Sequence, residues 1–440
     1  FDRSGSEIWN SGNDSFMMYS IDKNGHLLGG KKYDNSNLWI TGVQYDFLNG
    51  VIWKQEDTSP INHDMIQLDD GKIIGIQGGY GKSLPIPLGR WTDEFRNLGF
   101  FADGITNEFY WGAGRIVELD KEFESETIIW NPFDYYYIED FDSLGSTWEN
   151  AIISNQYDWL HSNSISYYNG FLYISQRHLS RVSKVKYPEG NLIWNMGIEK
   201  THKNTSIKNI CSEIGFTWQH DVKMLNNGNM LMLDNGNLSK LIRNTPVQES
   251  RLLEFEVVND DSCIVHWEYS IDDSLYAHAM GSVQKLENQN YLFSTIAGEG
   301  IGQILEVTKD EEIAWHASIY TNSSENKEYN IYRAYSVPGL FPNAFSIISK
   351  SSDLMDSTNS QIHLEIYNEG DYNQYYEYDV IVEKLATSIY KINLSIEPQN
   401  FPESKKYFQY YYLDSLKQEE TISNENGSFL IERGKSYSFL

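Results

Sequence analysis

Short apolar or alternating runs, separated by turns rich in Asn, Gly and Asp, recur along the first three quarters of the chain. One begins at His220, reaches a tight turn at Asn227 and Gly228, and returns as the apolar segment 230–233. Two such runs joined by Asn-Gly are typical of a β-hairpin, and the 3.6-residue period of a helix is hard to find. The pattern therefore predicts an all-β protein.

Two signatures alternate through this region. One is a short apolar strand that ends in tryptophan, and the other is a hairpin that opens with an aromatic residue or a histidine. The first ends at Trp9, Trp53, Trp130, Trp194, Trp267 and Trp315, and the second opens at Phe16, His63, His161, His220, His278 and Tyr332. Each pair supplies four strands, the content of one propeller blade, so six pairs predict a six-bladed β-propeller.

The two ends of the repeat region are predicted to close the sixth blade together. The chain begins on the outer hairpin of Trp9, and its last repeat ends on the inner strand that starts at Tyr332. A ring closed in this way has no open sheet edge. We expect this catalytic propeller to span residues 1–345, with the tryptophans packing between blades.

Beyond residue 345 the tryptophan signature is lost. Strand-like segments recur at 362–367, 375–382, 390–394, 407–413 and 429–432. We expect a small β-rich domain over residues 346–440, which shows no cluster of side chains typical of a site.

Charge and composition argue against several classes of binding partner. Among 440 residues, 34 are Lys or Arg and 62 are Asp or Glu, and the net charge of −28 disfavours nucleic acid and anionic membranes. No run approaches the roughly 18 apolar residues of a membrane helix, so no membrane span is expected.

Cys211 and Cys263 permit one disulfide but are too far apart for a zinc knuckle. The first residues show no signal peptide, and we expect a segment upstream of Phe1 to have been removed.

Four predicted inner strands open with histidine, namely those at His63, His161, His220 and His278. Inner strands line the central channel, so these side chains are expected at its mouth. A single histidine there is more often structural, but recurrence at one repeat position favours a functional site.

The hairpin after His161 adds polar groups to the same place. Asn163 shares a strand face with His161 if the strand alternates regularly, and the hairpin brings Arg177 alongside. Imidazole, amide and guanidinium groups around one cavity favour a tetrahedral oxyanion. The alternative is a network that satisfies buried backbone groups.

A metal ion is the competing ligand for the histidines. The charge of Arg177 would repel a cation, and Asp64 and Asp221 should point to the opposite strand face. We therefore expect no metal and no cofactor. No nucleotide-type phosphate loop is present either.

The site motifs resemble a known family. Residues 158–164 (Asp-Trp-Leu-His-Ser-Asn-Ser), 175–178 (Ser-Gln-Arg-His), 217–221 (Thr-Trp-Gln-His-Asp) and 227–229 (Asn-Gly-Asn) resemble those of the PAPS-independent arylsulfate sulfotransferases. The resemblance covers residues 1–342. It implies a six-bladed propeller that transfers a sulfuryl group from an aryl sulfate to a phenol through a sulfated histidine, without PAPS.

Carried over to this chain, the resemblance makes His220 the nucleophile. His161, Asn163 and Arg177 would hold the sulfuryl oxygens, and His63 matches the remaining family histidine. Further candidates for substrate binding are the mouth-loop aromatics and one extra histidine without a family role: Tyr110, Trp111, Trp159 and His278.

This chain departs from the family in lacking its N-terminal β-sandwich and its closely spaced cysteine pair. The expected partners are an aryl sulfate donor and a phenolic acceptor, with a homodimer as a further candidate, and the expected location is periplasmic or secreted. Two other function classes remain open. The propeller could bind a sulfated or other anionic ligand without turnover, or it could be a lyase or hydrolase that acts on an acidic glycan.

Overall fold

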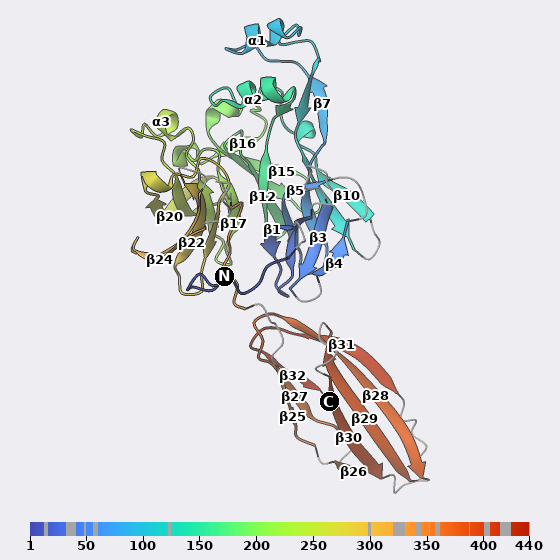
Figure 1. Ribbon diagram of the computed structural model, residues 1–440. Coiled ribbons are helices and arrows are strands. Elements are labelled where there is room, and N and C mark those ends of the chain that lie inside the picture. Colours follow the sequence, from blue (N-terminus) through green and yellow to red (C-terminus); the bar gives the residue numbers. More distant parts are fainter. Residues whose placement is uncertain are drawn as a thin grey trace. The chain divides into compact units, whose positions relative to one another are not determined.

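The computed structural model describes all residues except 13–15, 32–40, 48–49, 56–59, 122–124, 298–300, 320–330, 340–344, 352, 357–360, 387, 400–404, 414–423 and 440. The chain forms two compact units (Figure 1): Phe1–Ile21 with Leu27–Ser336, and Asp22–His26 with Val337–Leu440. Both are built mainly from strands, which confirms the predicted all-β class. No helix in the described ranges is long and apolar enough to cross a membrane.

Five sheets of at least four strands follow one another along the first unit, and consecutive strands pair antiparallel except β15 with β16. The first two sheets contain β1 (Phe16–Ile21), β2 (Leu27–Lys31), β3 (Thr41–Asp46) and β4 (Gly50–Lys54), then β5 (Ile61–Gln67), β6 (Ile73–Gln77), β9 (Arg115–Asp120) and β10 (Ser125–Trp130). The third contains β12 (Ser162–Tyr168), β13 (Phe171–Gln176), β14 (Arg181–Lys186), β15 (Leu192–Gly197) and β16 (Lys208–Ile210). The last two contain β17 (His220–Met224), β18 (Met230–Asp234), β19 (Arg251–Val258) and β20 (Ser262–Ser270), then β21 (Ser282–Lys285), β22 (Tyr291–Ala297), β23 (Ile301–Val307) and β24 (Ile313–Ser318).

The first strands of these sheets pack against one another in sequence order. β5 contacts both β1 and β12, and β17 contacts both β12 and β21. The predicted tryptophans mark the opposite side of each sheet, because Trp53, Trp130, Trp194, Trp267 and Trp315 all lie on its fourth strand. The repeat therefore distinguished inner strands from outer ones correctly.

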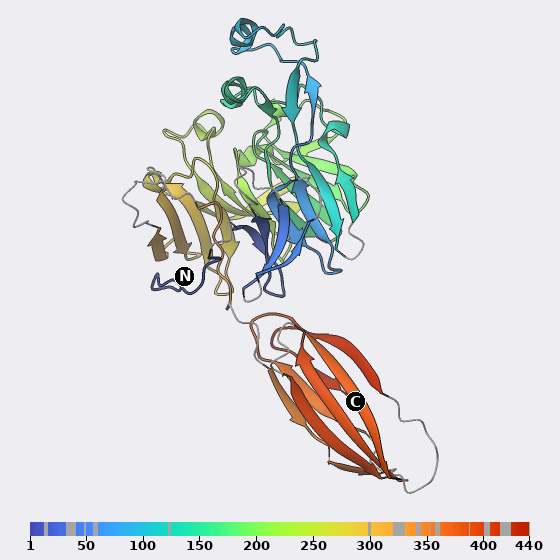
Figure 2. The same ribbon diagram turned by 45° about the vertical axis from the view of Figure 1, so that its right-hand side comes forward.

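Insertions between the strands carry the short helices. A small sheet of β7 (Gly81–Leu84), β8 (Phe109–Gly112) and β11 (Tyr157–Asp158) accompanies α1 (Thr92–Asn97) and α2 (Thr147–Ser154), and α3 (Ser239–Ile242) follows β18. Single 3-10 turns occur at η1 (Pro132–Asp134), η2 (Glu199–Thr201), η3 (Ser212–Ile214) and η4 (Asp273–Leu275). Figures 1 and 2 show α1, α2 and α3 at the same end of the first unit.

The predicted strands at Trp9 and Tyr332 do not form. Residues 6–10 and 331–336 have no strand structure. The physical reason is visible beside β21, where the N–H groups of Ala334 and Ser336 bond to the side chains of Ser282 and Gln284 and not to a backbone ladder.

Arg333 ties this segment to the first strands. Its guanidinium is buried and donates to Asp64 Oδ1 at 2.8 Å, to the Tyr19 carbonyl at 2.6 Å and to the Asn163 carbonyl at 2.7 Å. These partners belong to β1, β5 and β12. Asp64 also accepts the N–H of Ile165, so this carboxylate serves the packing of neighbouring strands.

The two cysteines form the disulfide that the sequence permits. Cys211, just before η3, is bonded to Cys263 of β20. The bond joins the end of the third sheet to the outer strand of the fourth.

The second unit contains two sheets. One consists of β25 (Phe345–Ser349), β27 (Leu364–Asn368) and β32 (Ser436–Phe439), and the other of β26 (Leu354–Asp356), β30 (Lys406–Leu413), β29 (Ile389–Pro398), β28 (Gln374–Ala386) and β31 (Glu425–Ile431). Residues of both sheets, among them Ile366, Tyr376 and Tyr410, share one buried core.

Candidate active site

The inner strands are kinked where the predicted histidines lie. His63, His161 and Asp221 have positive φ angles of 65°, 48° and 51°, and the strand register shifts at each place. Positive φ is uncommon for residues other than glycine and recurs at functional sites. Each kink also breaks the alternation of side chains along its strand.

His220 is the first residue of β17 and is 4% exposed. Its Nδ1 lies 2.7 Å from Oδ1 of Asn235, which directly follows β18. The Asn235 Nδ2 donates to the carbonyls of Ala277 and Met280 at 2.8 and 3.0 Å, which fixes the orientation of the amide. Because Oδ1 only accepts, Nδ1 of His220 carries the proton and Nε2 keeps its lone pair.

Burial, reinforced by the positive charge of Arg177, holds the pKa of His220 well below the usual value for histidine. The ring is therefore neutral at pH 7. A neutral imidazole with a fixed tautomer is suited to nucleophilic attack through Nε2.

Arg177 directly follows β13, and its N–H donates to the carbonyl of His161. Its guanidinium lies over the ring of Trp218, 4.2 Å from the ring centroid, and Nη2 contacts the carbonyl of His278 at 3.4 Å. Burial lowers its pKa to about 10, so it remains charged at neutral pH. Its Nε has no hydrogen-bond partner among the described residues and is available to an anion.

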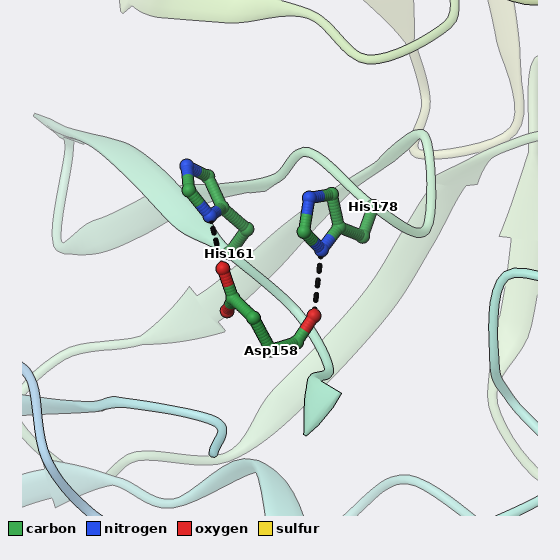
Figure 3. A group of neighbouring side chains, drawn as sticks. All are labelled: Asp158, His161 and His178. Atoms are coloured by element: carbon green, nitrogen blue, oxygen red, sulfur yellow. Dashed lines mark hydrogen bonds and ion pairs between the residues drawn. The ribbon is translucent and has the colours of Figure 1, made fainter. Parts of the chain in front are cut away.

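Asp158, His161 and His178 form a connected group (Figure 3). Nδ1 of His161 bonds to Oδ2 of Asp158, and Nδ1 of His178 bonds to the Asp158 carbonyl at 2.6 Å. Partial loss of hydration would raise the pKa of Asp158, whose side chain is partly exposed, but its interaction with His161 lowers it overall, so the carboxylate is ionised. Among the described residues these three also group as candidate metal ligands, with ligand atoms within 4.8 Å of one another.

His63 extends this group. Its ring centroid lies 4.6 Å from that of His161, and its Nδ1 lies 2.9 Å from the hydroxyl of Tyr332. Burial and the neighbouring His161 hold the pKa of His63 well below its usual value. His63 is accordingly neutral at pH 7.

The prediction that Asn163 shares a face with His161 is wrong. His161 precedes β12, and the register shift between Ser162 and Ser164 breaks the alternation. The Asn163 side chain is fully buried and donates to the carbonyl of Gln219 at 2.8 Å. It therefore links β12 to the residue before the nucleophile candidate.

Three other candidates also lie elsewhere than expected. Trp111 and Trp159 are 1% and 0% exposed and belong to the hydrophobic core, so neither can stack on a substrate. His278 does not open a strand, because it lies in an exposed loop four residues before β21. Only its carbonyl reaches the site, through Arg177.

Tyr110 is 36% exposed and lines a cavity of about 260 Å³. Tyr80, His63, His161 and Asp158 also line this cavity, which His220 does not. The cavity therefore adjoins the histidine group on the side of β8.

Sequence reasoning assigned no role to Asn235, Asp158, His178 or Tyr332. Asp158 and His178 stand within the site motifs, so their polar character beside named candidates was a usable signal. Asn235 was detectable only as part of the polar loop that follows an apolar strand, whereas Tyr332 opens the sixth predicted hairpin at the repeat position of the histidines, which was the available signal.

The three neutral histidines give an expected pH dependence of stability. The pKa of His178 is lowered by burial to about 3, and those of His63 and His220 are also lowered. As the pH falls below about 6.5, the unfolded chain binds these protons before the folded one, so the free energy of unfolding should fall by up to about 1.4 kcal/mol per pH unit for each histidine. Urea unfolding at pH 7 and pH 5 measures this loss. His178→Gln should reduce the slope, and an unchanged slope would contradict the assignment.

A family model matches much of the first unit. The family model described as Arylsulfotransferase (ASST) matches residues 110–335, slightly more than half of the chain. No curated protein shows significant similarity.

Similar solved structures include hydrazine synthase of Kuenenia stuttgartiensis, with 8% identity and a TM-score of 0.28. The match covers 67% of this chain and 59% of that one. Another, described as the extracellular domain of a hybrid two component system of B. thetaiotaomicron, has 10% identity, a TM-score of 0.34, and coverage of 93% and 57%. The chain thus spans less than two thirds of either structure.

Proposed function

The chain belongs to the arylsulfotransferase family, and on this premise we propose that it moves a sulfuryl group from an aryl sulfate to a phenol, in two steps and through a sulfated His220. Family membership supports aryl sulfotransferase activity in general. The observation that carries the two-step mechanism is the His220–Asn235 contact, which leaves Nε2 of a neutral imidazole unprotonated.

In the first step, Nε2 of His220 attacks the sulfur, the bond from sulfur to the aryl oxygen breaks, and a phenolate leaves. In the second step, the oxygen of an acceptor phenol attacks the same sulfur, the N–S bond breaks, and the acceptor loses its proton. Ping-pong kinetics follow from this order. Sulfuryl transfer should resemble phosphoryl transfer in its loose transition state, so positioning and charge stabilisation dominate catalysis.

His161 is suited to proton transfer in both steps. Asp158 accepts from its Nδ1, which orients the ring and stabilises the imidazolium that forms when Nε2 takes a proton. His63 is held neutral by burial and by His161. We assign the proton to His161 for these reasons, and place His63 beside it as a hydrogen-bonding partner of the substrate.

Arg177 would stabilise the charge on the sulfuryl oxygens. Arg177→Met removes the guanidinium and should lower kcat about 100-fold, by analogy with the loss of one oxyanion-stabilising donor. Steady-state rates with a nitrophenyl sulfate give the measurement. The matched control is Arg243→Met, since Arg243 pairs with Glu249 near α3. A loss of similar size in both variants would argue against a specific role for Arg177.

We propose the six-bladed ring as the architecture that holds this site. Two outer tryptophans, Trp194 and Trp267, bond to the turn between the third and fourth strands of the next sheet, at Asp260 and Lys309. Trp315 of the fifth sheet donates instead to the carbonyl of Arg3, and Trp9 donates to Phe47 of the first sheet. These two bonds support a role for the N-terminal segment in the place of a sixth outer hairpin. With residues 331–336 beside β21, this supports a ring closed by both ends of residues 1–345.

We further propose a periplasmic or secreted location. The Cys211–Cys263 disulfide supports it, because such bonds persist mainly in oxidising compartments. The predicted homodimer stays a prediction.

Incubation with a nitrophenyl sulfate, followed by intact-mass measurement after a rapid quench without acid, tests the function. One added sulfuryl group, discharged by phenol and formed equally in the presence of a chelator, is the expected result. Absence of both the adduct and phenol-dependent nitrophenol release would overturn it.

A further inference from the structure

We propose that the cavity beside His63 and His161 binds the acceptor, and that it selects a phenol carrying a cationic substituent over a neutral or anionic one. This inference rests on the proposed function, because the bound phenol is an acceptor only if the protein transfers a sulfuryl group. The selectivity itself rests on the walls of the cavity and on the charges that face it.

The walls suit one aromatic ring. At about 260 Å³ the cavity lies near the lower end of the range for small-molecule sites. Gly78, Gly79, Gly112 and Gly114 line it without side chains, so a flat ring can approach their backbone closely. The Tyr110 hydroxyl donates to the Gly79 carbonyl at 2.9 Å, which holds the two sides of the cavity together and fixes an aromatic face there.

One end of the cavity presents proton-transfer groups. His63 and His161 both line it, and a phenolic hydroxyl placed against them would meet the imidazole assigned to deprotonate the acceptor. His220 does not line the cavity, so a ring bound there leaves the sulfated nitrogen outside the ring-binding space.

The charge facing the cavity is negative. Asp158 is the only Asp, Glu, Lys or Arg among the described lining residues. Its Oδ2 bonds to His161, whereas its Oδ1 accepts from no described residue, and the side chain is 55% exposed. An ammonium group can therefore pair with Oδ1, while a carboxylate would face repulsion.

The guanidinium groups near the cavity stand outside its lining: neither Arg115 nor Arg177, whose charge interacts with Asp158, is among the residues that line it. Arg115 lies over the ring of Tyr80 and is already paired with Glu126 and Gln77. The chain as a whole carries a net charge of −28, which adds to the preference for a cation.

Equilibrium binding to the protein without donor tests the selectivity. The probes are 3-(aminomethyl)phenol, 3-(hydroxymethyl)phenol and 3-hydroxybenzoate, which are similar in size and differ in charge. Calorimetry should show the cationic phenol binding about fivefold or more tightly than the neutral one, and the anionic phenol most weakly, with the differences shrinking at high salt. Equal affinities for the three probes would overturn the proposal.

A charge variant makes the test specific to the cavity. Gln156 is exposed and lines the cavity, so Gln156→Lys should fold normally and should reverse the preference toward 3-hydroxybenzoate. Ser154→Lys introduces the same charge at an exposed position outside the lining and should keep the original order. Equal effects of the two variants would show that the order reflects overall charge and would contradict a cavity site.

The outcome is separate from that of the proposed function. Nitrophenol release in a first turnover reports on His220 and needs no acceptor, whereas the binding order needs no turnover. Loss of either result therefore identifies which inference is wrong.

Discussion

His220→Asn is expected to abolish both the sulfuryl adduct and turnover, lowering kcat by at least about 10⁴-fold, as the loss of a covalent nucleophile does in other enzymes. Asparagine occupies similar space and has a polar end for Asn235, but it offers no basic nitrogen to attack sulfur. The fold should survive, because His220 is joined to its surroundings through a single side-chain hydrogen bond among the described residues. Intact mass after mixing with a nitrophenyl sulfate, together with the first-turnover release of nitrophenol, gives the measurement.

The control for this variant is His202, a histidine whose pKa is also lowered but which lies outside the candidate site. His202 also has a pKa lowered by burial, and its Nε2 lies 3.1 Å from the carbonyl of Ile207, away from the site. His202→Asn should leave the adduct and the rate nearly unchanged. An adduct that persists in His220→Asn, or that maps to His161, would assign the covalent step to a different residue.

The repeat made much of the first unit predictable. Apolar strands must bury their faces, and a tryptophan at one position in each repeat predicted the fourth strand of all five sheets. The ends were harder, because strand formation at Trp9 and Tyr332 depends on backbone partners from distant parts of the chain. Residues 331–336 instead bond to side chains of β21, a choice that no local pattern reveals.

The site was predictable in its residue types but not in its geometry. His63, His161 and His220 became candidates because histidine recurs at one repeat position, and Arg177 because its hairpin returns beside His161. The positive φ angles at the kinks could not be inferred, since these residues rarely adopt them and only the surrounding fold stabilises them. A regular strand would have placed Asn163 next to His161, which is why that prediction failed.

The aromatic candidates failed for a different reason. Sequence shows that Trp111 and Trp159 lie in insertions near the mouth, but not that the insertions fold into a core of their own. The rings of Trp111 and Trp159 are both buried there. Tyr110, the neighbour of Trp111 on β8, points to the other face of the strand and is exposed. Burial within an insertion is a tertiary property, so the position of these residues in the repeat could not reveal it.

Asn235→Ala is expected to lower the rate of His220 sulfation up to about 10⁴-fold, the loss seen when a catalytic histidine is held in the wrong tautomer. Asn235 Oδ1 keeps the proton on Nδ1, and its Nδ2 bonds to Ala277 and Met280 keep Oδ1 in place. Without the amide, Nδ1 has no acceptor, and the proton can move to Nε2 and remove the nucleophilic lone pair. The rate of nitrophenol release in a single turnover measures the effect, and imidazole ¹⁵N chemical shifts report which ring nitrogen is protonated.

Asn235→Asp and Asn237→Ala separate this role from simple packing. Aspartate keeps an acceptor for Nδ1–H but loses both donors, so it should recover part of the rate and retain the Nδ1–H tautomer. Asn237 donates to the His278 carbonyl in the same pair of loops without touching His220, so Asn237→Ala should leave the tautomer unchanged.

If Asn235→Ala slowed the reaction while the ¹⁵N shifts still showed Nδ1–H, the amide would act by holding the loop. The nucleophile would then owe its tautomer to another group. If Asn237→Ala produced the same loss of rate, the loops as a whole would position His220, and Asn235 would have no special part.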